Sequence, residues 1–430
     1  MKKIISIIVF VGILASGGYY LNSTNKYFSS KVKTVESEDV YVGFVMEAYD
    51  LIEKNYWAEP AQYNLDEMFR LSLEKVTGKT FSLASSTRTG TAEMFALAFS
   101  SSSSTDIKKK LALDTVMVVT YNLQPNGRSG VLSQTEEKNL RQNVSNINPS
   151  NDLYKDLGVA KGASAEEVAK AFETKSQQLK ASTSPEAKAQ LEKITYAKKV
   201  LTSPDNKSAY DSNQIEPTVF SRKIGKTLYV YMSKISPTTF LEFAKAVDHA
   251  STTPGLNSMI LDVRGNVGGS LDFVQNFVGL FKGPNQYAFD LFHQGKYETI
   301  RTTQQKFSLL DRFGEIAIIT DNMTQSTAEV ISATFKRLNM GKTVGVATRG
   351  WGTVENTFPI TTVIDENTKY SLLLVNSITL RDDNQPIEGR GVDPNILTTD
   401  KDWKTKIKNN FHTDSLVNAL NSTAKSLPLK

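Results

Sequence analysis

The 430-residue sequence predicts an α/β fold with additional helices at its N-terminal side and a small helical insert. After Pro217, short runs rich in β-branched and aromatic residues alternate with amphipathic runs, which is typical of an α/β sheet. Residues 40–76 instead repeat their apolar positions at helical spacing. Residues 152–211 are helical in pattern and rich in lysine, so we expect a separate helical unit there.

The first part of the chain divides at clear sequence breaks. Two helices fit within residues 40–76, and they are separated around the Trp-Ala-Glu-Pro stretch at 57–60. The Ser/Thr-rich stretch at 100–105 is typical of a loop, and Pro-Asn-Gly at 125–127 favours a turn. We therefore predict an N-terminal helical region over residues 37–149.

The N-terminus has the composition of a membrane-targeting segment. Lys2 and Lys3 precede residues 4–21, a stretch of eighteen residues without a charge. This pattern is typical of an export signal or of a single membrane anchor. We predict that residues 1–22 form an uncleaved anchor with its positive end inside. A cleaved signal and a buried core helix are the alternatives. As an anchor, it places the rest of the chain outside the cytoplasm on a single-pass protein of the cell membrane; as a cleaved signal, it yields a secreted protein.

The composition excludes several classes of site. The chain has no cysteine, which excludes disulfides, thiolate metal sites and a cysteine nucleophile. Its three histidines, His249, His293 and His412, are too scattered to suggest a metal site. A formal net charge of +5, spread over the whole chain, does not indicate a nucleic-acid partner. We expect no metal and no cofactor, so catalysis would rest on Ser, Thr, Lys, Tyr, Asp or Glu.

Residues 150–212 resemble the J-domain of the co-chaperone family. The matching positions are mostly packing residues, such as Leu157, Phe172 and Tyr210, and Ser164 with Glu167 forms the pattern of a capping box. In that family a His-Pro-Asp turn between two helices engages the Hsp70 partner, and here the equivalent stretch is Lys-Ala-Ser at 180–182. We therefore expect the helical fold without an Hsp70 partner, and a role as a spacer or peptide-docking module.

Two later segments contain residues suited to catalysis. In the first, the buried run ending at Asp262 enters a glycine-rich turn that includes Gly268 and Gly269. Bare backbone N–H groups of such a turn can face an anion or oxyanion, although a tight strand-to-helix turn is an equal alternative. In the second, a β-run ends near Asp321 and Ser326 opens an amphipathic helix. That position suits a nucleophile, and it suits a helix cap equally well.

Residues 225–396 resemble the catalytic domain of the C-terminal processing, or tail-specific, serine peptidases. Five blocks occur in the family's order, among them LDVRGNVGGSLD, ITDNMTQSTAEVISATFK and IEGRGVDPNI. The resemblance implies a β-α core similar to that of ClpP and crotonase, over residues 215–400, followed by a C-terminal tail at 401–430. The PDZ module that normally precedes this core is not recognisable, and the J-like insert stands in its place.

The resemblance also implies roles for individual residues. Ser326 falls on the nucleophile, and Gly268 and Gly269 fall on the turn that shares the oxyanion hole with the backbone N–H at Ser326 or Thr327. The family's general-base lysine, 25 residues after the serine, is replaced by Trp351. A further position that is commonly glutamine in the family is Glu355.

The missing lysine leaves the general base open. Tryptophan has only an N–H donor, and Arg349 stays protonated, so neither accepts the serine proton. Glu329 shares a helix face with Ser326 and is one candidate base, and Glu355 is another. Holding Arg349 or a backbone group is the more ordinary role for both glutamates.

We therefore predict an exported, membrane-anchored serine peptidase that acts on unfolded or C-terminal polypeptides through an atypical active site. A catalytically silent peptide-binding or scaffold protein is the main alternative. A J-type co-chaperone is a third possibility that the sequence disfavours.

Overall fold

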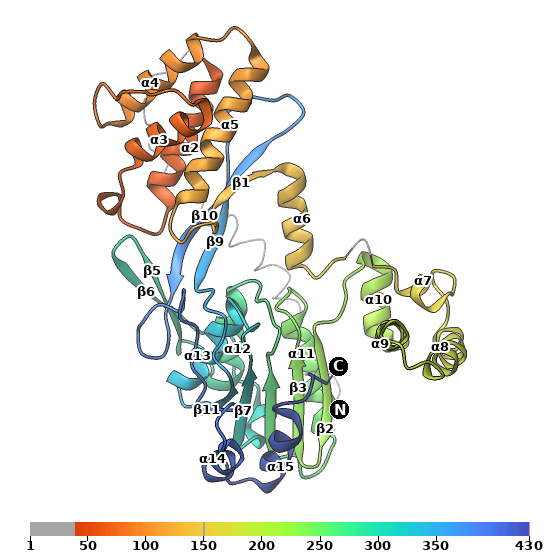
Figure 1. Cartoon of the computed structure of the whole chain (residues 1–430). Helices are drawn as coiled ribbons and strands as arrows, with labels where there is room; N and C mark the ends of the chain where they lie inside the picture. The colour runs from red at the N-terminus through yellow and green to blue at the C-terminus, as the bar shows by residue number, and fades with distance from the viewer. Residues whose placement is uncertain (1–38, 149–150, 430) are drawn as a thin grey trace, which may run out of the picture.

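The computed structural model describes residues 39–148 and 151–429 and confirms the predicted α/β class. A helical lobe lies at one end of the molecule and an α/β core at the other, with extended strands joining them (Figure 1). The J-like helices project to one side, beyond α6 (Gln134–Val144). The predicted anchor at residues 1–22 lies outside the described residues. Within the described ranges, no helix is both long and apolar enough to cross a bilayer.

The helical lobe is built from α2 (Val40–Asn55), the short η3 (Pro60–Gln62), α3 (Leu65–Thr77), α4 (Arg88–Ser100) and α5 (Thr105–Asn122). A polar side chain caps each of the four longer helices by accepting a backbone N–H in the first turn; the caps are Asp39, Asn64, Thr87 and Ser104. Fully buried phenylalanines fill the centre: Phe44, Phe69, Phe95 and Phe99. The helix break near residue 57 and the loop after residue 100 agree with the sequence-based prediction.

A small antiparallel sheet links this lobe to the core. Its strands are β1 (Gly130–Ser133), β5 (Tyr287–His293), β6 (Lys296–Arg301), β9 (Thr353–Pro359) and β10 (Tyr370–Thr379), with β10 at the centre. Strand β1 was not predicted, because residues 37–149 were expected to be helical. The four residues of β1 pair with Tyr370 to Leu373, which lie more than two hundred residues later in the chain. A local sequence pattern therefore could not predict this strand.

The J-like insert contains α7 (Leu153–Leu157), α8 (Ala165–Lys180), α9 (Pro185–Leu201) and α10 (Pro204–Asn213). Buried apolar residues from all four helices form its own core. The Lys-Ala-Ser stretch lies at the end of α8 and just beyond it. Tyr196 is one contact between the insert and the rest of the chain: its hydroxyl donates to Glu216, and its ring lies 6.2 Å from that of Phe220. Asp205 is another, because it pairs with Lys245 at 2.6 Å.

The core sheet has six strands in the order β11-β8-β7-β4-β3-β2. The strands are β2 (Val219–Ile224), β3 (Thr227–Met232), β4 (Ser258–Asp262), β7 (Glu315–Thr320), β8 (Lys342–Gly345) and β11 (Ile396–Leu397). All neighbours are parallel except β2 and β3. A parallel sheet is buried on both faces, which explains the continuous apolar runs of β3, β4 and β7.

Helices cover both faces of this sheet. One face packs against α11 (Thr239–Ser251), α12 (Asp272–Lys282) and α13 (Thr327–Arg337), with η4 (Ser308–Arg312) at its border. The other face packs against α14 (Trp403–Asn410) and α15 (Asp414–Thr423). From the sequence we expected a polar and weakly helical tail at 401–430, and the helices agree with that expectation but the polar surface does not. Instead, Trp403, Ile407, Leu416 and Leu420 are buried against the sheet, because their spacing gives each short helix an apolar side.

Candidate active site

Three neighbouring parallel strands of the core sheet end at one edge, and each leads into a loop that the sequence had singled out. Strand β4 continues into the glycine turn at 265–269, β7 leads to Ser326, and β8 leads to Trp351. The carboxyl ends of parallel strands meet at the same edge, where α/β folds place their sites. The topology therefore brings residues from three distant parts of the sequence together.

Ser326 has a strained backbone at the start of α13. It occupies the N-cap with φ of 56° and ψ of −129°, a region that non-glycine residues avoid. The residues before it are fixed by bonds to the glycine-turn segment: Gln325 N donates to Asn266 O and the Thr324 hydroxyl to Val263 O, both at 2.9 Å. Strain of this kind amounts to about 1–3 kcal/mol and persists where the surroundings over-determine the conformation.

Gly268 lies directly against Ser326. Its φ is +83°, and a Cβ atom at this position would lie 2.6 Å from the Ser326 Cβ and 3.0 Å from its Oγ. Only glycine fits a position with that φ and that contact. The next carbonyl, of Gly269, accepts the Thr327 hydroxyl at 2.8 Å. The two predicted glycines therefore border the serine and the first residue of its helix.

The backbone N–H groups around Ser326 differ in their bonding. Gly268 N–H donates to Asn266 Oδ1, and Ser326 N–H donates to Glu329 Oε2, both at 2.8 Å. Among the residues that the structure describes, no acceptor bonds the N–H of Gly269 or of Thr327. The sequence analysis offered the N–H of Ser326 or of Thr327 for an oxyanion hole beside the glycine turn. The Ser326 N–H is bonded to Glu329, so of these two only the Thr327 N–H is available.

Glu329 is fully buried beside Ser326 and accepts four hydrogen bonds. Besides Ser326 N–H, its carboxylate accepts the Trp351 N–H at 2.8 Å, the Gly350 N–H at 2.7 Å and the Thr348 hydroxyl. Burial raises the pKa of Glu329, and these donors oppose the rise. Three of the partners are backbone N–H groups, which can only donate, so the carboxylate acts here as an acceptor that joins two loops.

Trp351 stands between two glycines in the loop after β8. Its backbone N–H donates to Glu329, and its indole Nε1–H donates to Glu355 Oε1 at 3.1 Å. Burial raises the pKa of Glu355, and the Thr353 hydroxyl and the indole N–H oppose the rise. Glu355 thus bonds the tryptophan, and no hydrogen bond links it to Ser326 among the described residues. Arg349 is exposed and lies near the Met323 sulfur rather than at either glutamate.

Two residues that the sequence analysis did not single out complete this cluster. The Arg128 guanidinium stacks 3.3 Å above the Trp351 ring and pairs with Glu388 at 3.0 Å. The second Glu388 oxygen accepts the Gly352 N–H at 2.8 Å. Arg128 lies 223 positions before Trp351 in the sequence, and no local pattern could link them. Glu388 lies inside the IEGRGVDPNI block, which was the one available signal.

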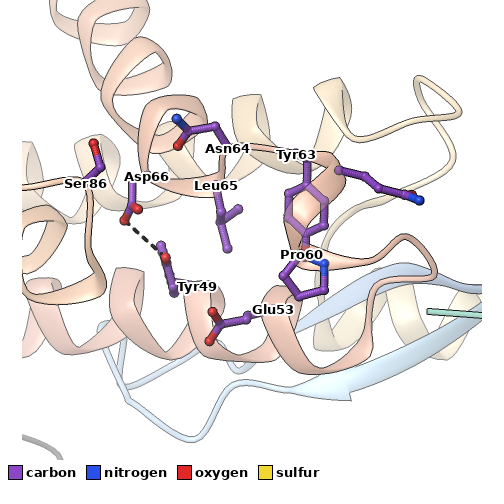
Figure 2. A pocket seen from close by; sticks show the side chains of 9 residues that line it. Tyr49, Glu53, Pro60, Tyr63, Asn64, Leu65, Asp66 and Ser86 are labelled. Atoms are coloured by element: carbon purple, nitrogen blue, oxygen red, sulfur yellow. Dashed lines mark hydrogen bonds between the residues drawn. The ribbon is translucent and has the colours of Figure 1, made fainter. Parts of the chain in front are cut away.

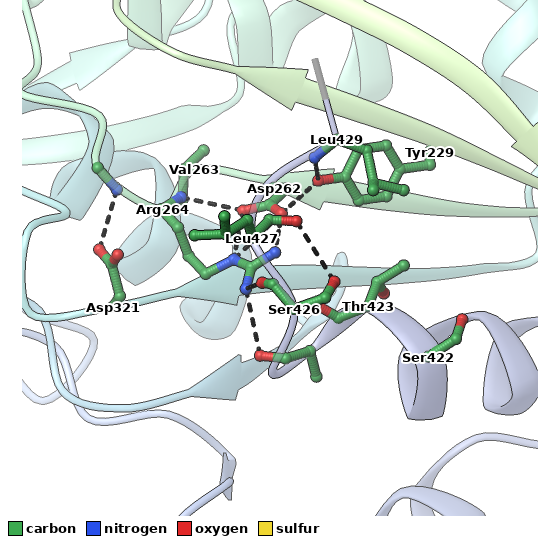
Figure 3. Close-up of polar contacts among 12 residues, drawn as sticks. Tyr229, Asp262, Val263, Arg264, Asp321, Ser422, Thr423, Ser426, Leu427 and Leu429 are labelled. Carbon is green, nitrogen blue, oxygen red and sulfur yellow. Dashed lines mark hydrogen bonds and ion pairs between the residues drawn. The ribbon is translucent and has the colours of Figure 1, made fainter. Parts of the chain in front are cut away.

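A buried ion pair lies immediately behind the glycine turn (Figure 3). Asp262 is fully buried, and Arg264, with 8% of its side chain exposed, pairs with it at 2.5 Å. The Tyr229 hydroxyl also donates to Asp262, and Arg264 donates to the carbonyl of Ser426. The Leu429 N–H donates in turn to the Tyr229 hydroxyl at 3.0 Å. The segment after α15 therefore covers the charges that precede the turn.

Two surface cavities lie elsewhere. One, of about 420 Å³, is in the helical lobe, where Tyr49 donates to Asp66 at 3.1 Å and Glu53 and Tyr63 also line the space (Figure 2). The other, of about 550 Å³, lies along α6. Ser326 lines neither. In the described part of the chain, no three His, Cys, Asp or Glu residues are grouped to hold a metal ion.

Comparison with known proteins identifies the core. Residues 226–398 match peptidase family S41. The chain is 27% identical over 176 residues to a probable CtpA-like serine protease of Staphylococcus aureus, which corresponds to 41% of this chain and 34% of that protein. The solved structure of the photosystem II D1 C-terminal processing protease superposes with a TM-score of 0.50 at 12% identity, covering 92% of this chain and all of that one. Residues 226–398 are therefore similar to the S41 peptidases, and the C-terminal processing proteases are among the proteins that the chain resembles.

The helical insert is identified in the same way. Residues 152–211 match the DnaJ domain. The chaperone protein DnaJ of Jannaschia sp. is 44% identical over 63 residues, which is 14% of this chain and 16% of that protein. Both predicted resemblances are thus confirmed, and the chain spans about a third or less of the length of these curated relatives.

Proposed function

We propose that this protein is a serine-type peptidase of the C-terminal processing class and that Ser326 is its nucleophile. The observation that carries this proposal is the backbone of Ser326, which has a positive φ at the first turn of α13 and lies against Gly268. Strained residues concentrate at catalytic sites, where the strain holds a group ready to react. A helix cap alone does not require that conformation, because N-cap residues normally adopt the extended region.

In this proposal the Ser326 Oγ attacks a peptide carbonyl, and the negative charge develops on the carbonyl oxygen. The unoccupied N–H groups of Gly269 and Thr327 supply donors for that oxygen. The positive end of the α13 dipole lies at the same point and favours the anion. The proton of Ser326 passes to a base and then to the leaving amine as the C–N bond breaks. Water then hydrolyses the acyl-enzyme and restores the Ser326 hydroxyl.

The base is the unusual part of the proposed mechanism. Trp351 cannot accept a proton, and Glu355 bonds the indole. Glu329 accepts the Ser326 backbone N–H and three other donors rather than the Ser326 hydroxyl, so neither glutamate is placed as an efficient base. Loss of an efficient general base lowers rates by about 10²–10⁴-fold. We therefore expect slow turnover.

The proposed substrates are unfolded polypeptides or polypeptide C-termini. The names of the similar proteins support this substrate class, since one is a C-terminal processing protease. Val267 and Met323 are exposed apolar side chains in the two segments that border Ser326, and they offer contacts for an extended chain. We further propose that residues 1–22 anchor the protein in the cell membrane with the peptidase domain outside the cytoplasm, on the basis of the uncharged stretch after Lys3.

A peptide-binding protein without turnover is the second candidate. The observation that favours it is the Trp351 ring, which is stacked with Arg128 and belongs to the residue that the resemblance aligns with the family's lysine. This function would use the same surface and would not require Ser326 Oγ.

Hydrolysis of an unfolded, fluorescently labelled polypeptide separates the two candidates. The peptidase proposal predicts slow cleavage by the wild-type protein and none by Ser326→Ala, with peptide binding retained in both. Trp351→Lys should raise turnover if only the base is missing. Equal cleavage by wild type and Ser326→Ala would exclude the serine mechanism, and binding without cleavage in all three proteins would establish the second candidate.

A further inference from the structure

A chain of contacts connects the helical lobe to Ser326. It begins in the segment between α5 and β1, where the Gln124 carbonyl accepts the Tyr56 hydroxyl and, at 2.7 Å, the Trp57 indole N–H, both from the lobe. Further along the same segment, Ser129 accepts the Val375 N–H of β10 at 3.1 Å. Arg128 lies between these two anchor points, so the lobe determines where its side chain is placed.

Arg128 then holds the loop that carries Trp351. Its guanidinium covers the Trp351 ring at 3.3 Å, and its ion pair with Glu388 is mostly shielded, with 18% and 16% of the two side chains exposed. Glu388 uses its other oxygen to accept the Gly352 N–H. An Arg–aromatic stack combined with a carboxylate pair needs the flat guanidinium, which lysine cannot reproduce.

The same loop is bonded to Ser326 through one oxygen atom. Glu329 Oε2 accepts the Trp351 N–H and the Ser326 N–H, each at 2.8 Å. The loop is tightly packed against the backbone of residues 388–390. A Cβ at Gly352 would lie 2.3 Å from the Glu388 N atom, and one at Gly350 would lie 2.9 Å from the Arg390 N atom. A displacement of Trp351 therefore changes the acceptor that holds the strained Ser326 backbone.

We propose that Arg128 is a positioning residue through which the helical lobe holds Ser326 in its reactive conformation. The inference rests on the proposed function for its effect on catalysis, but the mechanical connection is independent of it. Arg128 takes no part in proton transfer. It holds the Trp351 ring, the Trp351 N–H bonds to the Glu329 carboxylate, and that carboxylate holds the Ser326 N–H. The lysine of the family is thus replaced by an aromatic residue that serves as a contact surface for the lobe.

Amide hydrogen exchange on the full chain tests the connection without requiring activity. Arg128→Ala should accelerate exchange in the peptides covering 347–353 and 322–330, whereas exchange in the core strands β3 and β4, 227–232 and 258–262, stays unchanged and shows that the core is folded. Arg128→Lys should accelerate both segments to a smaller degree. Arg141→Ala, which removes an exposed arginine paired with Glu137 on α6, is the matched control and should change neither. Faster exchange at 347–353 with no change at 322–330 would overturn the proposal.

Hydrolysis kinetics test the consequence for catalysis. Arg128→Ala should lower kcat roughly tenfold to a hundredfold while KM changes little, since a misplaced nucleophile reduces rate more than binding. Arg128→Lys should recover part of kcat, and Arg141→Ala should equal wild type. An unchanged kcat in Arg128→Ala would overturn the positioning role. If wild type and Ser326→Ala are both inactive, the proposed function has failed, and the exchange comparison still decides whether Arg128 holds Ser326.

Discussion

Gly265 and Gly268 belong to one turn and have similar positive φ angles, yet only Gly268 lies against the Ser326 side chain. Gly265 has φ of +69° with nothing within 4 Å of an added Cβ, whereas Gly268 has φ of +83° and faces the Ser326 side chain. The comparison separates two functions of glycine: tolerance of a left-handed conformation and room for a neighbour. At the residue scale, the site depends on the second.

Alanine substitution at these two glycines should therefore have different results. Gly265→Ala should lower the free energy of unfolding by about 1 kcal/mol and keep most hydrolytic activity, because it only strains the backbone. Gly268→Ala carries the same strain and must also displace Ser326, so activity should be lost. Chemical denaturation and peptide hydrolysis measure the two effects. Similar activity in both variants would show that the contact between Gly268 and Ser326 is unimportant.

The carboxyl group of Glu355 should make stability depend on pH. Its pKa is raised above the ordinary value of 4.5 by burial, so the folded state prefers the protonated form. The stabilisation is present below pH 4.5 and is lost as pH rises through the raised pKa. Glu355→Gln keeps an oxygen for the Trp351 and Thr353 donors but does not titrate. The unfolding free energy of wild type relative to this variant should decrease from pH 4 to pH 7, and an increase would contradict the assignment.

At the scale of elements, the end of β4 depends on helix α15 and the segment after it. The Asp262–Arg264 pair is buried under residues 424–429, and the glycine turn starts at the next residue. Arrangements of this kind stabilise a turn only while both charges are present, because a single buried charge is very unfavourable. The sequence analysis singled out the glycine turn but did not predict that residues 424–429 cover the ion pair before it.

Removal of one partner of this pair should be costly. Arg264→Ala leaves Asp262 buried without its cation, and we expect a loss of about 3–5 kcal/mol in the free energy of unfolding. Lys306→Ala, which breaks the exposed Lys306–Asp311 pair, should lose less than about 1 kcal/mol. Denaturant unfolding of both variants provides the comparison. Equal losses in the free energy of unfolding would mean that the buried pair stabilises the fold no more than the exposed pair does.

The core strands and helices followed their sequence patterns closely, and the connecting sheet did not. Strands β3, β4 and β7 carry long apolar runs, and α11, α12 and α13 carry apolar stripes, so burial determines both. Strand β1 instead forms through pairing with β10, more than two hundred positions later, and β10 also pairs with its sequence neighbour β9. In the site, Ser326 and the glycine turn could be predicted from a family resemblance, whereas Arg128 could not, because its contacts with Trp351 and Glu388 exist only after the lobe and the core have packed.

At the scale of the whole molecule, an S41-like core carries a J-like insert that keeps its packing residues and lacks the His-Pro-Asp turn of the J-domain family. Leu153, Leu157, Val168 and Ile194 are fully or almost fully buried in the insert. Tyr196 and Glu216 fix it beside strand β2, at one edge of the core sheet. The insert is thus a folded module attached to the S41-like core, and its role as a spacer or docking module stays a prediction.

The insert should not stimulate an Hsp70. Without the His-Pro-Asp turn that the resemblance assigns to that task, the wild-type protein should leave the steady-state ATPase rate of an Hsp70 at its basal value. A variant with Lys180→His, Ala181→Pro and Ser182→Asp is the comparison that asks whether only the turn is missing. Stimulation by the wild-type protein would show that the insert works as a co-chaperone by another surface.

The most direct measurement is peptide mapping by mass spectrometry after prolonged reaction of the full-length protein with a fluorophosphonate. The bound phosphonate should lie on the peptide containing Ser326, and Gly268→Ala should reduce its amount. Label on a different serine, or equal labelling of Ser326 in the native and urea-unfolded protein, would mean that the fold does not activate this hydroxyl.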